Sequence, residues 1–138
     1  MSAMDSLRRA LTIAAALVLT GLWGGVSLAA VSVPWATQAG DASGDIGIAI
    51  STLSDSSAIV TGYFQGTAAF GSTTLTSAGS KDVFVAKIDA SGAYVSATQA
   101  GGTSSNVGRA ISTLSDGSAI VTGDFQGTAT FGSTTLTS

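Results

Sequence analysis

The chain has 138 residues, a formal net charge of −3, and neither cysteine nor histidine. Its five basic residues are too few for the basic patch that nucleic-acid binding requires, so DNA and RNA partners are excluded. Within this sequence the missing cysteine and histidine exclude disulfides, thiolate and imidazole metal sites, and Ser-His-Asp or Cys-His nucleophiles.

Residues 1–29 have the layout of a secretory signal peptide. Arg8 and Arg9 form a positive segment, and a mainly apolar run follows from Leu11 to Leu22. Ser27-Leu28-Ala29 then supplies a small-x-small cleavage site. We therefore expect an exported protein in the periplasm, in the medium or at the cell surface, with no membrane contact in its mature form.

An uncleaved membrane anchor is the alternative reading of this segment. The apolar stretch can be extended to Ala30, which brings its length close to the roughly 20 residues that a membrane span needs. The adjacent arginines also permit a twin-arginine export route, although the residues after them do not otherwise resemble that signal.

An internal repeat with an offset of 61 residues organises the rest of the chain. Residues 36–77 align with 97–138, and 33 of these 42 positions are identical. A period this long means that each repeat is a supersecondary unit that packs on its neighbours. We divide this part into a closing strand and turn (30–45), a complete first repeat (46–106) and an incomplete second repeat (107–138).

The first repeat opens with two predicted strands. Ile46, Ile48 and Ile50 alternate with smaller residues, which predicts a strand whose isoleucines share one sheet face. A turn cluster at residues 53–57 then leads into a second strand at 58–64.

The second half of the repeat begins with a polar insertion at residues 65–80, in which Ala69–Phe70 and Thr73–Thr76 can add a short hairpin. The third strand is predicted at Asp82–Ile88 and the fourth at Ala93–Gln99. No apolar stripe with helical spacing follows residue 30, so the fold class is all-β.

Three kinds of segment in this sequence resemble the bacterial β-propeller repeat proteins of the SBBP type. They are the AIVTG-ending runs at 47–62 and 108–123, DVFVAKIDASGAYV at 82–95, and the closing ATQAGG at 97–102. The resemblance implies that each repeat is one four-stranded antiparallel propeller blade. It implies no catalytic residue, because the family carries no single assigned activity.

The residues before the first repeat fit a closed ring. Val33–Gln38 aligns with Tyr94–Gln99, the last strand of the repeat. A propeller commonly closes by letting an N-terminal strand complete its last blade, which hides an unpaired edge.

Aspartates provide the candidate sites, each with a plainer reading. Asp41 and Asp45 have the spacing of a small calcium loop, but Gly102 and Asn106 replace them in the second copy, so we expect a fold that does not depend on calcium. Asp55, Asp89 and Asp116 lie in turns, where a short carboxylate commonly bonds its own backbone. We assign no catalytic, cofactor-binding or metal-ligating residue, and expect no cofactor.

Other recurring residues are read mainly as structure. The five phenylalanines are expected in the core: Phe64, Phe70, Phe84, Phe125 and Phe131. Tyr63 is replaced by Asp124 in the second copy, which suits a surface position or a ligand-facing one. The threonines near 73–76 and 134–137 suit strands and could also form the hydroxyl array of an adhesin.

The function expected from the sequence is that of an exported, non-enzymatic interaction or structural scaffold. Its partner is a protein or a carbohydrate that the sequence does not identify, together with further blades of the same protein. One alternative is a secreted polysaccharide-acting enzyme or lyase whose active site lies beyond residue 138, and another is a β-solenoid adhesin. Because the second repeat lacks its last strands, we expect residues 30–138 alone not to form a stable monomer.

The signal-peptide assignment makes a direct prediction. The mature protein should begin at Ala30, because cleavage is expected after the Ser27-Leu28-Ala29 site. N-terminal sequencing of the exported product checks this. A membrane-embedded product that still begins at Met1 would identify the segment as an anchor.

Overall fold

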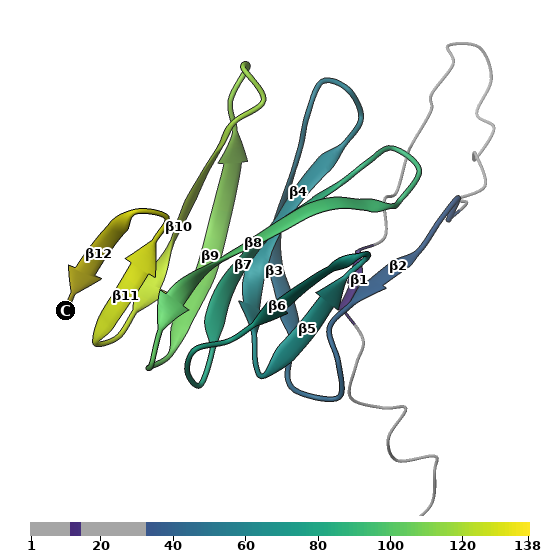
Figure 1. Cartoon of the computed structure of the whole chain (residues 1–138). Helices are drawn as coiled ribbons and strands as arrows, with labels where there is room; N and C mark the ends of the chain where they lie inside the picture. The colour runs from purple at the N-terminus through teal and green to yellow at the C-terminus, as the bar shows by residue number, and fades with distance from the viewer. Residues whose placement is uncertain (1–11, 15–32) are drawn as a thin grey trace, which may run out of the picture.

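The computed structural model describes residues 12–14 and 33–138, and these residues form β-strands and no helix, as the sequence predicts (Figure 1). Accordingly, this part of the chain contains no helix able to cross a membrane. In chain order the strands are β1 (Thr12–Ala14), β2 (Thr37–Ala39), β3 (Ile46–Thr52), β4 (Ala58–Phe64), β5 (Thr67–Phe70), β6 (Thr73–Thr76), β7 (Asp82–Ile88), β8 (Tyr94–Gly102), β9 (Asn106–Thr113), β10 (Ala119–Phe125), β11 (Thr128–Phe131) and β12 (Thr134–Thr137).

The first repeat forms an antiparallel meander of β3, β4, β7 and β8, with the β5–β6 hairpin between β4 and β7 in the chain. The predicted strands at 58–64 and 82–88 are confirmed, as is the hairpin in the polar insertion. The fourth strand is longer than predicted, because β8 begins at Tyr94 and continues to Gly102. That extension pairs with β11, so β12 and β11 join the meander in one six-stranded sheet.

The core of the first repeat is aromatic. Phe64, Phe70 and Phe84 are almost fully buried, together with Ile88. The ring of Phe70 lies 4.8 Å from that of Phe84 and 6.4 Å from that of Phe64, between centroids. Such offset and edge-on contacts are the arrangements that aromatic rings prefer. The core prediction therefore holds for the first repeat.

The second repeat reproduces the local geometry of the first at the same offset. The turn bond from Leu53 N to Ser57 O recurs from Leu114 N to Ser118 O, each at 2.8 Å. The β5–β6 and β11–β12 hairpins have the same register. The β3–β4 and β9–β10 turns point to the same end of the molecule (Figure 1). The 61-residue alignment is therefore matched by recurring pairings in three dimensions.

The expected placement of the three isoleucines is wrong. The register passes from Gly47 opposite Gly62 to Ala49 opposite Thr61, so Ile48 is the extra residue of a β-bulge. Ile46 lies opposite Tyr63 and Ile50 opposite Val60, two positions on opposite faces of β4. The bulge therefore reverses the alternation, and all three isoleucines are exposed.

The N-terminal closing strand is shorter than expected. β2 begins at Thr37, and Trp35 lies outside it but packs against the core of the first repeat. β2 pairs with β1, which falls inside the predicted signal peptide. The remainder of that predicted segment lies outside the described residues.

The bulge requires glycine on the neighbouring strand. A Cβ at Gly62 would overlap the carbonyl oxygen of Ile46, and Gly123 has the same relation to Val107. Because the obstacle is backbone, a side-chain rotation cannot relieve it. The repeat therefore keeps glycine at both positions for close approach rather than for flexibility.

We predict that Gly62→Ala lowers the free energy of unfolding by about 3 kcal/mol, because the strands must separate to admit the methyl group. Gly117→Ser is the matched control. Its counterpart Ser56 already adopts a φ of 65°, so the control should cost about 1 kcal/mol or less. Denaturant melts of the variants decide this, and equal losses would contradict the overlap.

Candidate functional site

A buried carboxylate lies where the first repeat passes into the second. Asp82 at the start of β7 is 1% exposed, and its Oδ2 accepts a hydrogen bond from Ala78 N at 2.7 Å. Its Oδ1 accepts from Gly102 N at 3.2 Å and from Asn106 Nδ2 at 3.1 Å. Asn106 Nδ2 also donates to Lys81 O. These bonds fix the end of β8 and the start of β9 to the same point on β7.

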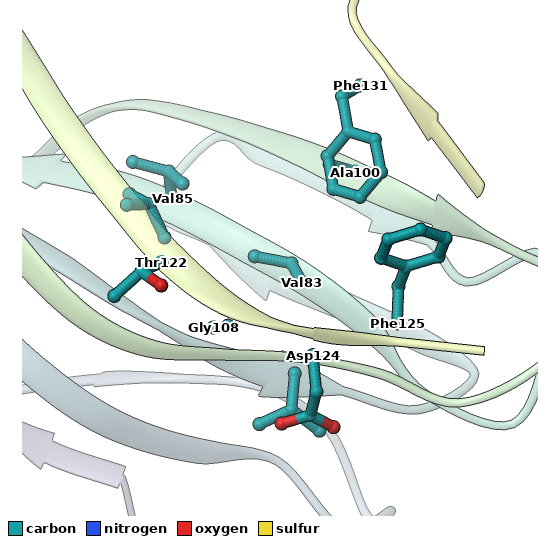
Figure 2. A pocket seen from close by; sticks show the side chains of 11 residues that line it. Val83, Val85, Ala100, Gly108, Thr122, Asp124, Phe125 and Phe131 are labelled. Atoms are coloured by element: carbon teal, nitrogen blue, oxygen red, sulfur yellow. The ribbon is translucent and has the colours of Figure 1, made fainter. Parts of the chain in front are cut away.

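Beside this joint an apolar cleft of about 220 Å³ opens between the repeats (Figure 2). The first repeat contributes Val83, Val85 and Ala100 from β7 and β8. The second contributes residues of β9, β10 and β11: Val107, Gly108, Val121, Thr122, Gly123, Asp124, Phe125 and Phe131. Figure 2 shows the rings of Phe125 and Phe131 side by side, and their centroids are 5.6 Å apart.

The cleft is built to hold apolar groups. Its one carboxylate, on Asp124, points away from Phe125 on the other side of the β10 ribbon (Figure 2). That carboxylate pairs with Arg109 Nε at 2.5 Å, on the exposed surface. Gly123, which is exposed, leaves the backbone of β10 accessible beside the two phenylalanine rings. A bound group would thus meet aromatic and aliphatic walls together with main-chain N–H and C=O groups.

Comparison with known proteins identifies no family for this chain. No family model, no curated protein and no solved structure matches the chain.

The residues considered for calcium accept hydrogen bonds from backbone N–H groups. Asp45 Oδ2 accepts from Asp41 N at 2.9 Å, and its Oδ1 accepts from Gln65 N at 3.0 Å. Asp41 Oδ1 accepts from Ser43 N at 2.6 Å. Across residues 12–14 and 33–138, no three His, Cys, Asp or Glu side chains gather in a way that could hold a metal ion. Independence from calcium stays a prediction.

The turn aspartates bond their own backbone, as predicted. Asp116 Oδ1 accepts from Ser118 N at 2.9 Å and from Ser118 Oγ at 2.6 Å. Asp55 has the same two bonds to Ser57, and Asp89 to Ser91. The serine hydroxyl, followed by backbone N–H groups, lowers the pKa of each carboxyl below its ordinary value of 3.8. These carboxylates stabilise turns.

The position that is Tyr63 in the first repeat and Asp124 in the second makes a different surface contact in each copy. Tyr63 lies under Lys81, whose Nζ is 4.3 Å from the ring centroid. Its counterpart Asp124 pairs with Arg109. Because Arg109 itself replaces Ile48, two neighbouring positions change together between the repeats. No ligand-facing role is needed to explain the substitution.

The threonines of the two hairpins form short hydroxyl ladders. Thr67 and Thr76 lie 3.3 Å apart between hydroxyl oxygens, and their counterparts Thr128 and Thr137 lie 3.1 Å apart. Both of these hydroxyl–hydroxyl hydrogen bonds lie on the exposed surface. The threonines therefore suit the strands and also present an array on the surface.

The joint and the cleft were not anticipated from the sequence. The sequence identifies Asp82 only as the first residue of a strand, and Asn106 only as the replacement for Asp45. The repeat alignment does carry a signal for the cleft, because Phe131 is the counterpart of Phe70 and the sequence contains no second copy of Phe84. Phe125 and Phe131 are only half-buried, so they meet the prediction of a core position only in part.

The lowered pKa values predict a dependence of stability on acid. A carboxyl whose folded pKa is depressed stabilises the fold above its unfolded pKa and loses that contribution as pH falls through the folded pKa. The midpoint temperature of thermal unfolding should therefore decrease as the pH is lowered below about 4. Replacing Asp55, Asp89 and Asp116 by asparagine should flatten this dependence, and equal slopes for the two proteins would contradict the assignment.

Proposed function

We propose that the chain belongs to an exported, repeat-built β-propeller protein that acts as a non-enzymatic interaction or structural scaffold. The observation that carries the proposal is the joint at Asp82, whose bonds to Gly102 N and Asn106 Nδ2 hold the end of β8 and the start of β9 against β7. The signal-peptide layout of residues 1–29 supports export.

Contacts elsewhere between the repeats support the same role. Ser51 Oγ lies 2.9 Å from Thr113 Oγ1, and Thr113 Oγ1 donates to Thr52 O. β9 thereby packs against the face of β3 and β4. Stacking of this kind can be repeated by further similar units, which is the usual design of repeat scaffolds.

The carboxylates are committed to architecture rather than placed for reaction. Asp55, Asp89 and Asp116 bond turn backbone, and Asp82 bonds three N–H donors. A glycoside-cleaving pair would instead need two carboxyl groups facing one another across a substrate. The exposed threonine ladders offer hydroxyls to a protein or carbohydrate partner without such a pair.

The proposal predicts binding without turnover. The exported protein should be recovered from the periplasm, the medium or the cell surface, and should retain partners on protein and polysaccharide arrays. The same samples should release no product above that of heat-denatured protein. Product that increases in proportion to the native protein would replace the scaffold by an enzyme, and recovery only from the cytoplasm would refute export.

A further inference from the structure

One five-residue sequence, Ala-Ile-Val-Thr-Gly, occurs in two surroundings. In β4 it is paired on both edges, with β3 on one side and β7 on the other. In β10 it is paired with β9, and its other edge faces no strand among the described residues. The exposed fraction of Ile59 is 8%, whereas that of its counterpart Ile120 is 60%. Because the sequences are identical, the neighbours cause this difference.

The paired copy shows what the open edge is shaped to receive. In the β4–β7 register Gly62 lies opposite Phe84 and Val60 opposite Ala86. Thr61 Oγ1 also donates to Phe84 O at 2.8 Å and is fully buried. Applied to β10, which lies 61 residues later in the sequence, the same register places an aromatic residue of an incoming strand opposite Gly123. Thr122, which is exposed, can then donate to the main chain of the incoming strand.

The cleft lies where that aromatic side chain would go. Phe84 packs on Phe70 in the first repeat, and the counterpart of Phe70 is Phe131 in the cleft wall. The cleft volume of about 220 Å³ is sufficient for one ring, since apolar cavities of about 150 Å³ bind benzene. Val83 and Val85 would cover the ring from the other side.

Charge complements this shape. In the first repeat Lys81, next to the β7 strand, lies over the ring of Tyr63. Asp124 occupies the position of Tyr63 in the second repeat. A lysine that precedes the incoming strand would therefore approach the exposed Asp124 carboxylate, which it would share with Arg109 for a modest attraction.

We propose that the free edge of β10, together with the cleft beside it, is a strand-acceptor site. Its occupant is an extended segment with the Lys-Asp-Val-Phe-Val-Ala-Lys-Ile pattern of residues 81–88. Main-chain hydrogen bonds to β10 provide the pairing, and the aromatic side chain in the cleft sets the register. The proposal depends on the repeat geometry and not on the scaffold role.

The test uses the full chain and a fluorescent peptide of residues 80–89. Fluorescence anisotropy should show saturable 1:1 binding. A peptide with Phe84→Ser should bind at least about tenfold more weakly, because it leaves the cleft empty. A peptide with Lys81→Glu should bind about threefold more weakly, because it brings two like charges together. A scrambled peptide of the same composition is the specificity control.

Hydrogen exchange locates the peptide. Binding should slow amide exchange in Ala119–Phe125 and leave the already paired β4 unchanged. In the chain, Phe131→Ser should weaken binding, whereas Leu136→Ser, an exposed change on the same hairpin, should not. The peptide series keeps the test valid if Phe131→Ser does not fold.

Three results would overturn the proposal. One is equal binding of the scrambled or Phe84→Ser peptide, and another is protection at a different strand edge. The third is protection of β10 without peptide that rises with protein concentration and resists competition, which would identify a second copy of the chain as the occupant.

Discussion

The hydrogen bonds of Asp82 determine how one repeat follows another. The carboxylate is buried, and it stays so because three N–H donors satisfy it: Ala78 N, Gly102 N and Asn106 Nδ2. A buried charge without such partners would cost several kcal/mol. The bonds tie β7 to the end of β8 and the start of β9, so the chain leaves one sheet and enters the next at a defined place. Close approach at Gly101 depends on the same contact, because a Cβ there would overlap the Asp82 carboxylate.

Burial in this molecule follows from neighbours as much as from sequence. Phe64 and Phe70 are buried because β7 and Tyr94 surround them, whereas Phe125 and Phe131 have the same local sequence and stay half-buried. Hydrophobic stabilisation scales with the apolar area that is removed from water, so the two copies contribute unequally despite near-identity. The unevenness arises because the first repeat completes its core with its own β7 and Tyr94, which have no counterpart among the described residues of the second.

Local signals predicted much of the fold. The apolar, β-branched segments 58–64 and 82–88 form strands at the expected residues, and Asp55, Asp89 and Asp116 stabilise turns through short-range bonds. Each of these features is encoded within a few residues. The predicted isoleucine face is wrong because a single extra residue at Ile48 reverses the alternation, and this bulge depends on how β3 pairs with Gly62 and its neighbours on another strand. The joint and the cleft were missed for the same reason, since both need contacts between residues far apart in sequence.

The strand edges of the molecule are not equally protected, and the difference has a physical pattern. Natural sheets protect free edges by short strands, charges, proline or bulges. β12 has only four residues and is rich in threonine, which limits what can pair with it. β10 has seven residues without proline or lysine, and its one charge is already paired with Arg109 on β9. Its bulge lies on the β9 side and leaves the outer edge regular. An edge of this length beside an apolar cleft exposes pairing groups and apolar surface together, and the identical Ala-Ile-Val-Thr-Gly segment of β4 shows that both are buried when a strand lies alongside.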